Sequence, residues 1–279
     1  MNEVEFYLED LKSKFNKIDF NNYSLSYSGG KDSHFLYWFI KQYLKDDKIK
    51  IVGVNTYMEH PQIRKRMYDN CDVVLKPELN PMEIKKKYGS PCFSKLQDEY
   101  ISRYQKGNRT KNTMDVVLGN NVMINLNNTA RNKLLSGNLH KISNKCCDYL
   151  KKKPMKKYLK DNNKKNILGV RASESIIRAN AYKSCFDKQG NFSPLWDLTS
   201  ELLNNIYKQY GIEIPPIYKT LTRTGCMGCP YGSNILKELK TLTISQKKFV
   251  TNYHKESYQT KGIPYDTEQL DIYDMESED

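Results

Sequence analysis

The chain contains the segment Tyr27-Ser28-Gly29-Gly30-Lys31-Asp32-Ser33, and the expected architecture follows from it. Residues 23–27 before it have the pattern of a β-strand, and residues 34–44 after it carry apolar side chains at helical spacing. The glycine pair allows a tight turn, and Asp and Ser commonly begin helices. A strand, a glycine turn and a helix N-terminus gather backbone N–H groups around one point, where the helix dipole also favours negative charge. The segment therefore predicts a phosphate-binding loop.

The residues of this loop distinguish it from two other phosphate-binding motifs. A Walker-type loop has Gly, four residues and then Gly-Lys-Ser/Thr, whereas a dinucleotide-binding loop has three spaced glycines, and the segment fits neither. Ser-Gly-Gly-x-Asp-Ser resembles instead the PP-loop of the ATP pyrophosphatase superfamily, also described as adenine nucleotide alpha hydrolase-like. The resemblance implies a nucleotide site formed by Ser28, Gly29, Gly30, Lys31, Asp32 and Ser33. The alternative is an ordinary glycine-rich turn.

Strand and helix patterns alternate along the first half of the chain. Residues 49–54 and 72–75 are predicted strands, and residues 61–68 and 81–88 are predicted helices. This order indicates an α/β fold, a Rossmann-like parallel sheet with helices on both faces and a helical C-terminal extension. We expect one domain over residues 1–232 with a loose insertion at about 107–140, a helical extension at 233–265 and an acidic tail at 266–279. Further helices are predicted at 198–210 and 244–258.

Composition limits the class of protein. The 279 residues include 45 Lys and Arg against 32 Asp and Glu, a net charge of +13, and the last fourteen residues contain no Lys or Arg. A basic body attracts polyanions such as nucleic acid, although a Lys-rich surface is also common without such a role. No stretch approaches the roughly 20 apolar residues of a membrane span, and the N-terminus lacks a signal-peptide pattern. We therefore expect a soluble, cytoplasmic protein that does not bind membranes.

Four of the seven cysteines form two pairs. Cys146 and Cys147 are adjacent, and about eighty residues later Cys226 and Cys229 form a Cys-x-x-Cys pair. In a cytoplasmic protein such cysteines are thiols or metal ligands rather than disulfides. Four thiolates can hold a tetrahedral metal ion or an iron–sulfur cluster. Two adjacent cysteines suit one zinc ion poorly because their side chains diverge, so a 4Fe-4S cluster is the prediction and zinc the alternative.

Cys-Cys followed by Cys-x-x-Cys resembles the 4Fe-4S signature of the adenylyl-sulfate reductase branch of the phosphoadenosine phosphosulfate (PAPS) reductase family. The likeness runs from about residue 22 to about residue 232. It includes Cys146-Cys147-Asp148-Tyr149-Leu150-Lys151-Lys152, Gly169-Val170-Arg171-Ala172-Ser173-Glu174-Ser175 with Arg178, and Pro194-Leu195-Trp196-Asp197. Asn55-Thr56-Tyr57-Met58-Glu59-His60-Pro61 resembles the family's Asp/Asn-Thr-Gly-x-Glu-x-Pro segment, with Tyr57 in place of the glycine. The resemblance implies nucleotide contacts from Asn55, Thr56, Arg171, Ser173, Glu174 and Arg178.

Three residues of the predicted nucleotide site, Lys31, Asp32 and Arg171, are also predicted to act in catalysis. Lys31 and the loop amides would neutralise charge on phosphates, Asp32 would reach a Mg2+ ion bound with ATP, and Arg171 would bind an oxyanion through two parallel hydrogen bonds. A predicted strand at 167–170 leads directly into Arg171 and would bring it to the loop.

Three functions remain open from the sequence. Sulfonucleotide reductases of this family carry a nucleophilic cysteine near the C-terminus, and no cysteine follows Cys229 here. Cys92 and Cys185 could be accessible, but neither has a motif that marks a nucleophile. We therefore predict an enzyme that cleaves ATP to AMP and pyrophosphate and adenylates a substrate for sulfur transfer, as in nucleic-acid thiolation. The alternatives are a sulfonucleotide reductase and a non-catalytic nucleotide-binding partner. A homo-oligomer or larger complex is expected, with a sulfur donor or reductant protein that the sequence does not identify.

Overall fold

The computed structural model describes residues 2–174, 176–181 and 183–264. By its internal contacts the chain divides into two compact units, each assembled from three separate segments. The first unit comprises residues 1–55, 61–76 and 153–218, and the second comprises residues 56–60, 77–152 and 219–279. The sequence-based boundary at residue 232 falls within the second unit. The predicted acidic tail and Ser175 lie outside the described residues.

The first unit contains a four-stranded parallel sheet with the strand order β3-β2-β1-β4. Its strands are β1 (Tyr23–Tyr27), β2 (Lys50–Val54), β3 (Val73–Leu75) and β4 (Lys165–Leu168). Leu25 in β1 pairs with Ile51 in β2 and with Ile167 in β4, and all three side chains are fully buried. Buried apolar strands are typical of parallel sheets with both faces covered. The predicted α/β class is confirmed.

Strand β4 lies two residues earlier than the sequence predicted. It pairs with β1 from Tyr23 opposite Lys165 to Ser26 opposite Leu168, and Val170 then turns back to donate its N–H to the carbonyl of Leu168. A Cβ atom on Gly169 would lie 3.0 Å from the backbone nitrogen of Ser33. The glycine thus allows the chain to leave β4 close to the start of the helix that follows β1.

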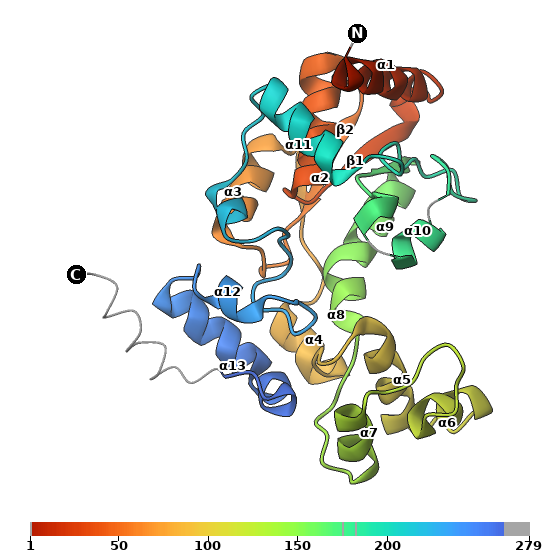
Figure 1. The fold of residues 1–279 in the computed structure, drawn as a ribbon, viewed down its shortest axis with the longest axis vertical. Helices are drawn as coiled ribbons and strands as arrows, with labels where there is room; N and C mark the ends of the chain where they lie inside the picture. Colours follow the sequence, from red (N-terminus) through yellow and green to blue (C-terminus); the bar gives the residue numbers. More distant parts are fainter. Residues whose placement is uncertain (1, 175, 182, 265–279) are drawn as a thin grey trace. The chain divides into compact units, whose positions relative to one another are not determined.

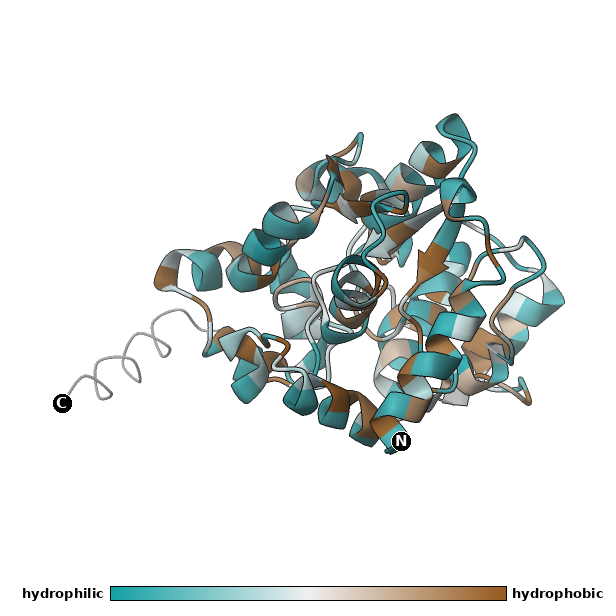
Figure 2. Cartoon of the chain, turned by 90° about the horizontal axis from the view of Figure 1, so that it is seen from above, coloured by the Kyte–Doolittle hydropathy of each residue, from teal (hydrophilic) through white to brown (hydrophobic). Residues whose placement is uncertain are grey.

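Helices cover the sheet of the first unit (Figure 1). They are α1 (Glu3–Phe15), α2 (Lys31–Trp38), α3 (Pro61–Asn70), α9 (Lys153–Asp161), α10 (Ile176–Ala181) and α11 (Ser200–Gln209). A π-helical turn, Phe39–Tyr43, continues α2, and 3-10 turns occur at Phe20–Asn22, Ala172–Glu174 and Pro216–Lys219. The helices carry both apolar and polar residues (brown and teal in Figure 2), and the apolar sides of α1, α2, α3 and α11 form one core with the strands. Within it the Phe15 ring centroid lies 5.3 Å from that of Phe39 and 5.2 Å from that of Phe192.

The second unit is helical. Its helices are α4 (Pro81–Tyr88), α5 (Lys95–Gln105), α6 (Lys111–Leu118), α7 (Asn128–Leu135), α8 (Lys145–Cys147), α12 (Ile235–Leu239) and α13 (Ile244–Lys261), and a π-helical turn, Asp148–Lys152, continues α8. The helices predicted at 81–88 and 244–258 are confirmed. No helix in the described part of the chain is long and apolar enough to cross a membrane.

The prediction of a loose segment at residues 107–140 is wrong. Helices α6 and α7 occupy much of this range, and with α5 they form a core that includes Ile101, Val116 and Ala130, all fully buried. The polar residues that suggested a loop instead begin and end these helices. The side chain of Asn127 accepts a hydrogen bond from the backbone of Ala130 at the start of α7, and Gly119 ends α6 in the left-handed conformation.

Candidate functional site

The predicted phosphate-binding loop follows β1 and leads into α2. Gly29 has a φ of +74°, and a Cβ atom there would lie 2.8 Å from the side chain of Ile63 and 2.9 Å from its carbonyl oxygen. Both observations explain why this position is glycine. Gly30 is the N-cap of α2 and has no side chain that could cap the helix. The first turn of α2 therefore has N–H groups that are not satisfied within the helix, as an anion site requires.

Two serines hold the loop in shape. The Ser33 hydroxyl donates to the carbonyl of Gly30 at 3.1 Å, accepts from the backbone N–H of Ser28 at 3.2 Å and lies 3.1 Å from the Ser28 hydroxyl. The side chain of Ser33 is buried, whereas Ser28 is exposed. Ser33 consequently closes the turn from inside, while Ser28 is the serine that a ligand could reach.

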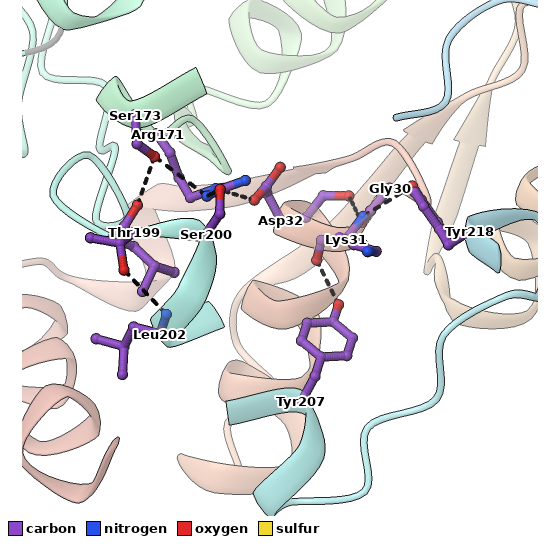
Figure 3. Close-up of polar contacts among 12 residues, drawn as sticks. Gly30, Lys31, Asp32, Arg171, Ser173, Thr199, Ser200, Leu202, Tyr207 and Tyr218 are labelled. Atoms are coloured by element: carbon purple, nitrogen blue, oxygen red, sulfur yellow. Dashed lines mark hydrogen bonds and ion pairs between the residues drawn. The ribbon is translucent and has the colours of Figure 1, made fainter. Parts of the chain in front are cut away.

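Two tyrosines that the sequence did not indicate fix the position of Lys31 (Figure 3). The backbone N–H of Lys31 donates to the Tyr218 hydroxyl at 3.3 Å, and its carbonyl accepts from the Tyr207 hydroxyl at 2.7 Å. The Lys31 ammonium nitrogen lies 4.8 Å from the centroid of the Tyr218 ring, within the range of a cation–π interaction. Burial lowers the pKa of Lys31, and the neighbouring Asp32 opposes this effect. The ammonium group is thus held beside the loop rather than extended into solvent.

Arg171 is bonded to the start of α2. Its Nε atom donates to Oδ1 of Asp32 at 2.5 Å, and a terminal nitrogen donates to the hydroxyls of Ser200 at 2.9 Å and Ser173 at 3.4 Å (Figure 3). Arg171 is only 8% exposed. Ser173 in turn donates to the carbonyl of Leu198 at 3.0 Å. The start of α11 and the turn after β4 therefore hold the guanidinium in place beside Asp32, whereas the predicted oxyanion binding by Arg171 stays a prediction.

The remaining predicted nucleotide residues lie in different surroundings. The side-chain amide of Asn55, after β2, donates to the Tyr68 hydroxyl at 2.8 Å within the first unit. Thr56 belongs to the second unit, where its N–H donates to the carboxylate of Glu59 and its hydroxyl donates to the same group. Arg178 is a half-buried residue of α10. Glu174 ends the 3-10 turn after Arg171, and its side chain lies outside the described part of the chain. Their contacts with a nucleotide remain predictions.

Tyr57 occupies the place of a glycine in the family segment. Its φ is +66°, a left-handed conformation that costs a residue with a Cβ atom about 1–2 kcal/mol. The backbone therefore keeps a conformation that suits glycine although a tyrosine stands there.

The four paired cysteines line one cavity of about 20 Å³ in the second unit. Cys146 and Cys147 lie in α8, and Cys226 and Cys229 form a turn in which the N–H of Cys229 donates to the carbonyl of Cys226 at 3.1 Å. The other lining residues are Met58, Pro91, Leu150, Lys151, Tyr253 and His254. The structure thus brings together the two pairs that the sequence separates by about eighty residues.

Helix α13 fixes the Cys-x-x-Cys turn. Gly228 has a φ of +59°, and a Cβ atom there would lie 2.1 Å from Val250 of this helix. The Tyr258 hydroxyl donates to the carbonyl of Gly228, and the Lys261 ammonium donates to the carbonyl of Pro230, both at 2.5 Å. The turn is consequently set by contacts from α13, which the sequence predicted only as a helical extension.

The cavity favours a thiolate at Cys147. A hydrogen bond from the Cys146 thiol lowers the pKa of Cys147 to about 6, with help from Lys95, Lys151 and Lys152, whereas the same bond raises the pKa of Cys146. Nearby cations that stabilise thiolates suit a metal centre, because the thiolate is the form that binds metal.

Residues 100–231 match the phosphoadenosine phosphosulfate reductase domain family. This stretch of the chain is similar to a PAPS reductase domain. The matched range includes both cysteine pairs, the turn with Arg171, and the tyrosines that hold Lys31. It confirms the family predicted from the motifs. No curated protein matches the chain.

Solved structures that are similar to this chain include three that share 12–14% identity with it. The PAPS reductase from Candida auris, in a phosphate complex, has 12% identity, covers 76% of this chain and 83% of its own, and has a TM-score of 0.41. The NAD+ synthetase from Burkholderia pseudomallei has 14% identity and a TM-score of 0.40, and the match covers 94% of this chain and 90% of the synthetase chain. The U34-tRNA thiolase NcsA from Methanococcus maripaludis, with its 4Fe-4S cluster, has 12% identity and a TM-score of 0.40, and the match covers 91% of this chain and 80% of the thiolase chain. None of these similarities assigns a function to this chain.

The donor set formed by the four paired cysteines fits an iron–sulfur cluster by its chemistry. Within residues 2–174, 176–181 and 183–264, no group of three or more His, Cys, Asp or Glu side chains is arranged to hold a metal ion. Four thiols lining one cavity are nevertheless the ligands that a 4Fe-4S cluster uses, since such a cluster distributes its ligands over several irons.

The three other cysteines lack the properties of a nucleophile. Cys92, which the sequence left open as accessible, is fully buried in the core beside α5, and burial raises the pKa of its thiol to about 12. Burial raises the pKa of Cys71 to about 12 as well, and also raises that of Cys185. A reactive cysteine has a lowered pKa, so none of these three is activated.

Proposed function

We propose that this PAPS reductase-domain enzyme binds Mg2+ and ATP at the loop before α2, adenylates a substrate with release of pyrophosphate, and thereby prepares it for sulfur transfer. The observation that carries the proposal is the convergence of positive groups at one point. The open N-terminus of α2, the Lys31 ammonium and the Arg171 guanidinium all lie around residues 28–33 or are bonded to them.

In the proposed first step a substrate oxygen attacks the α-phosphorus of ATP, and the bond to the β-phosphate oxygen breaks. Negative charge increases on the leaving pyrophosphate, where the Lys31 ammonium and the N–H groups of α2 stabilise it. Asp32 is the carboxylate available for Mg2+, and Arg171, which it orients, is available for a phosphate oxygen. A sulfur nucleophile then takes the place of AMP on the activated substrate.

Cys146, Cys147, Cys226 and Cys229 are the residues that would hold a 4Fe-4S cluster, with a zinc ion as the alternative occupant. When bound, the cluster would supply redox-active iron in a thiolate-lined cavity.

A nucleic-acid acceptor is favoured by charge. The chain has a net charge of +13, which attracts polyanions and raises the rate at which they bind. We infer that the acceptor is a nucleic acid and that a sulfur donor or reductant protein completes the reaction.

Sulfonucleotide reduction is the second candidate, because the matched family is named for it. That reaction requires a nucleophilic thiol outside the four paired cysteines. Cys71, Cys92 and Cys185 have raised rather than lowered pKa values, which disfavours each of them in this role.

Two parallel assays of anaerobically purified protein separate the candidates. In the first, formation of AMP and pyrophosphate from ATP, stimulated by RNA or DNA, supports adenylation. In the second, sulfite and AMP formed from adenylyl sulfate with a thiol reductant would instead establish a reductase. Lys31→Ala should reduce AMP formation by about 100-fold, the usual effect of removing one group that faces developing charge. Lys41→Ala is the matched control. Lys41 lies in the π-helical turn that continues α2, away from the loop, and forms an ion pair with Asp47.

A further inference from the structure

His254 is a buried histidine of α13 that the proposed reaction does not use. Its side chain is 2% exposed and lines the cavity of the four paired cysteines. Among the described residues neither of its ring nitrogens has a hydrogen-bond partner. No sequence pattern around it indicates a role, because a lone histidine on the apolar side of a helix usually belongs to the core.

An imidazole always carries a proton on at least one ring nitrogen, so His254 has a buried N–H donor in either tautomer. Leaving such a donor unsatisfied is energetically costly, and buried polar groups are nearly always paired. The missing acceptor is therefore a feature that requires an explanation within the cavity itself.

Neighbouring side chains hold the ring but do not satisfy it. The Tyr253 ring lies edge-on at a centroid distance of 4.7 Å, and the Tyr258 ring is stacked at 5.7 Å. The hydroxyl of Tyr253 donates to the carbonyl of Pro81, and that of Tyr258 donates to the carbonyl of Gly228. The imidazole thus contacts two fixed aromatic rings and lines a cavity that the four paired cysteines also line.

Sulfur atoms of cysteinates and of inorganic sulfide accept hydrogen bonds, and such bonds tune the potential of an iron–sulfur cluster. A donor withdraws electron density from the sulfur and stabilises the more negative, reduced state. Among the described lining residues, His254 offers an N–H without a partner, whereas Lys151 is already hydrogen-bonded to the thiol of Cys226.

We propose that His254 donates a hydrogen bond to a sulfur atom of the cluster held by the four cysteines and thereby raises its reduction potential. This inference rests on the proposed 4Fe-4S cofactor. It makes α13 a functional element, since the helix both holds the Cys-x-x-Cys turn and supplies the donor.

The test compares four full-length proteins purified without oxygen: wild type, His254→Phe, His254→Gln and His140→Phe. Phe fills the space without a donor, whereas Gln retains an N–H. His140 is the matched control, because it contacts Ser257 and Thr260 of the same helix and does not line the cavity. Iron and acid-labile sulfide are measured first, and the reduction potential is then measured by a titration followed by electron paramagnetic resonance.

We expect wild-type iron and sulfide content in all four proteins. The potential should become more negative in His254→Phe, stay close to wild type in His254→Gln, and remain unchanged in His140→Phe. An unchanged potential in a fully loaded His254→Phe protein overturns the inference. Loss of iron from His254→Phe, with strong nitrogen coupling in the wild-type resonance signal, would instead make His254 an iron ligand and also overturn it.

The failure of the cofactor is distinguishable from the failure of this inference. A wild-type protein that takes up no iron or sulfide refutes the cluster, and the donor role with it, before any variant is compared. A loaded wild type whose potential does not respond to residue 254 refutes the donor role alone. Should His254→Phe fail to fold, the loaded His254→Gln protein compared with His254→Leu gives the same decision.

Discussion

Replacing Arg171 with Met is expected to lower the free energy of unfolding of the first unit by about 3 kcal/mol. The side chain would lose one charge-assisted hydrogen bond to Asp32, which contributes about 2 kcal/mol, and two bonds to Ser200 and Ser173, which contribute about 0.5 kcal/mol each. The side chains of Arg171 and Asp32 are only 10% and 20% exposed, so solvent screens their pairing weakly.

Urea unfolding followed by tryptophan fluorescence measures this change. Both tryptophans of the chain, Trp38 and Trp196, belong to the first unit, so the signal reports on that unit. Lys65→Met is the control, because it removes an exposed ion pair with Asp69 and should leave the midpoint unchanged.

A double-mutant cycle isolates the pair itself. Asp32→Asn, Arg171→Met and the double variant should give a coupling energy of about 1.5–3 kcal/mol, since the two groups are in direct contact. A coupling energy near zero, or an Arg171→Met protein within about 0.5 kcal/mol of wild type, would refute the account of this pair.

Three further predictions concern other parts of the chain. Gly29→Ala should destabilise the first unit by about 2–4 kcal/mol, because it adds both left-handed backbone strain and overpacking. Gly211→Ala is the control: this glycine has a φ of +60° and nothing lies within 4 Å of its Cβ position, so only the backbone strain should appear. Equal urea midpoints for the two variants would contradict the steric argument. Burial, with a smaller effect of Arg66, lowers the pKa of His34 to about 3. The buried neutral imidazole therefore contributes to the free energy of unfolding above pH 6.5, and this contribution is lost as the pH falls. Between pH 7.5 and 4.5 wild type should therefore lose about 2–3 kcal/mol more stability than His34→Gln, and parallel urea curves would exclude this. Cys226→Ser should abolish the iron content and brown colour of anaerobic protein, whereas Cys185→Ser should keep both; iron retained at the wild-type level would remove Cys226 from the ligands.

The sequence predicted what is encoded locally. The loop at residues 28–33, strand β1 and helix α4 follow from glycine, proline and capping patterns within a few residues of each other, and the structure places them as expected. The two cysteine pairs were also found, because their spacing is itself the signal.

Long-range contacts could not be predicted in this way. Tyr207 and Tyr218 bond to Lys31 from more than 170 positions away, and no pattern around either tyrosine marks that role. His254 and α13 reach the cysteine turn only through tertiary packing. Helices α6 and α7 were missed for a different reason, because Asn and Gly read as loop residues when they are in fact helix caps.

The segmented construction of both units has a consequence for biosynthesis. Strands β1, β2 and β3 leave the ribosome long before β4, Arg171 and the tyrosines that hold Lys31, so the first unit cannot close until about residue 218 has emerged. Sheets that depend on such distant segments fold slowly. A nascent chain halted near residue 150 would therefore expose the edge of β1 that β4 later covers, and holding such chains soluble during translation is a task for chaperones.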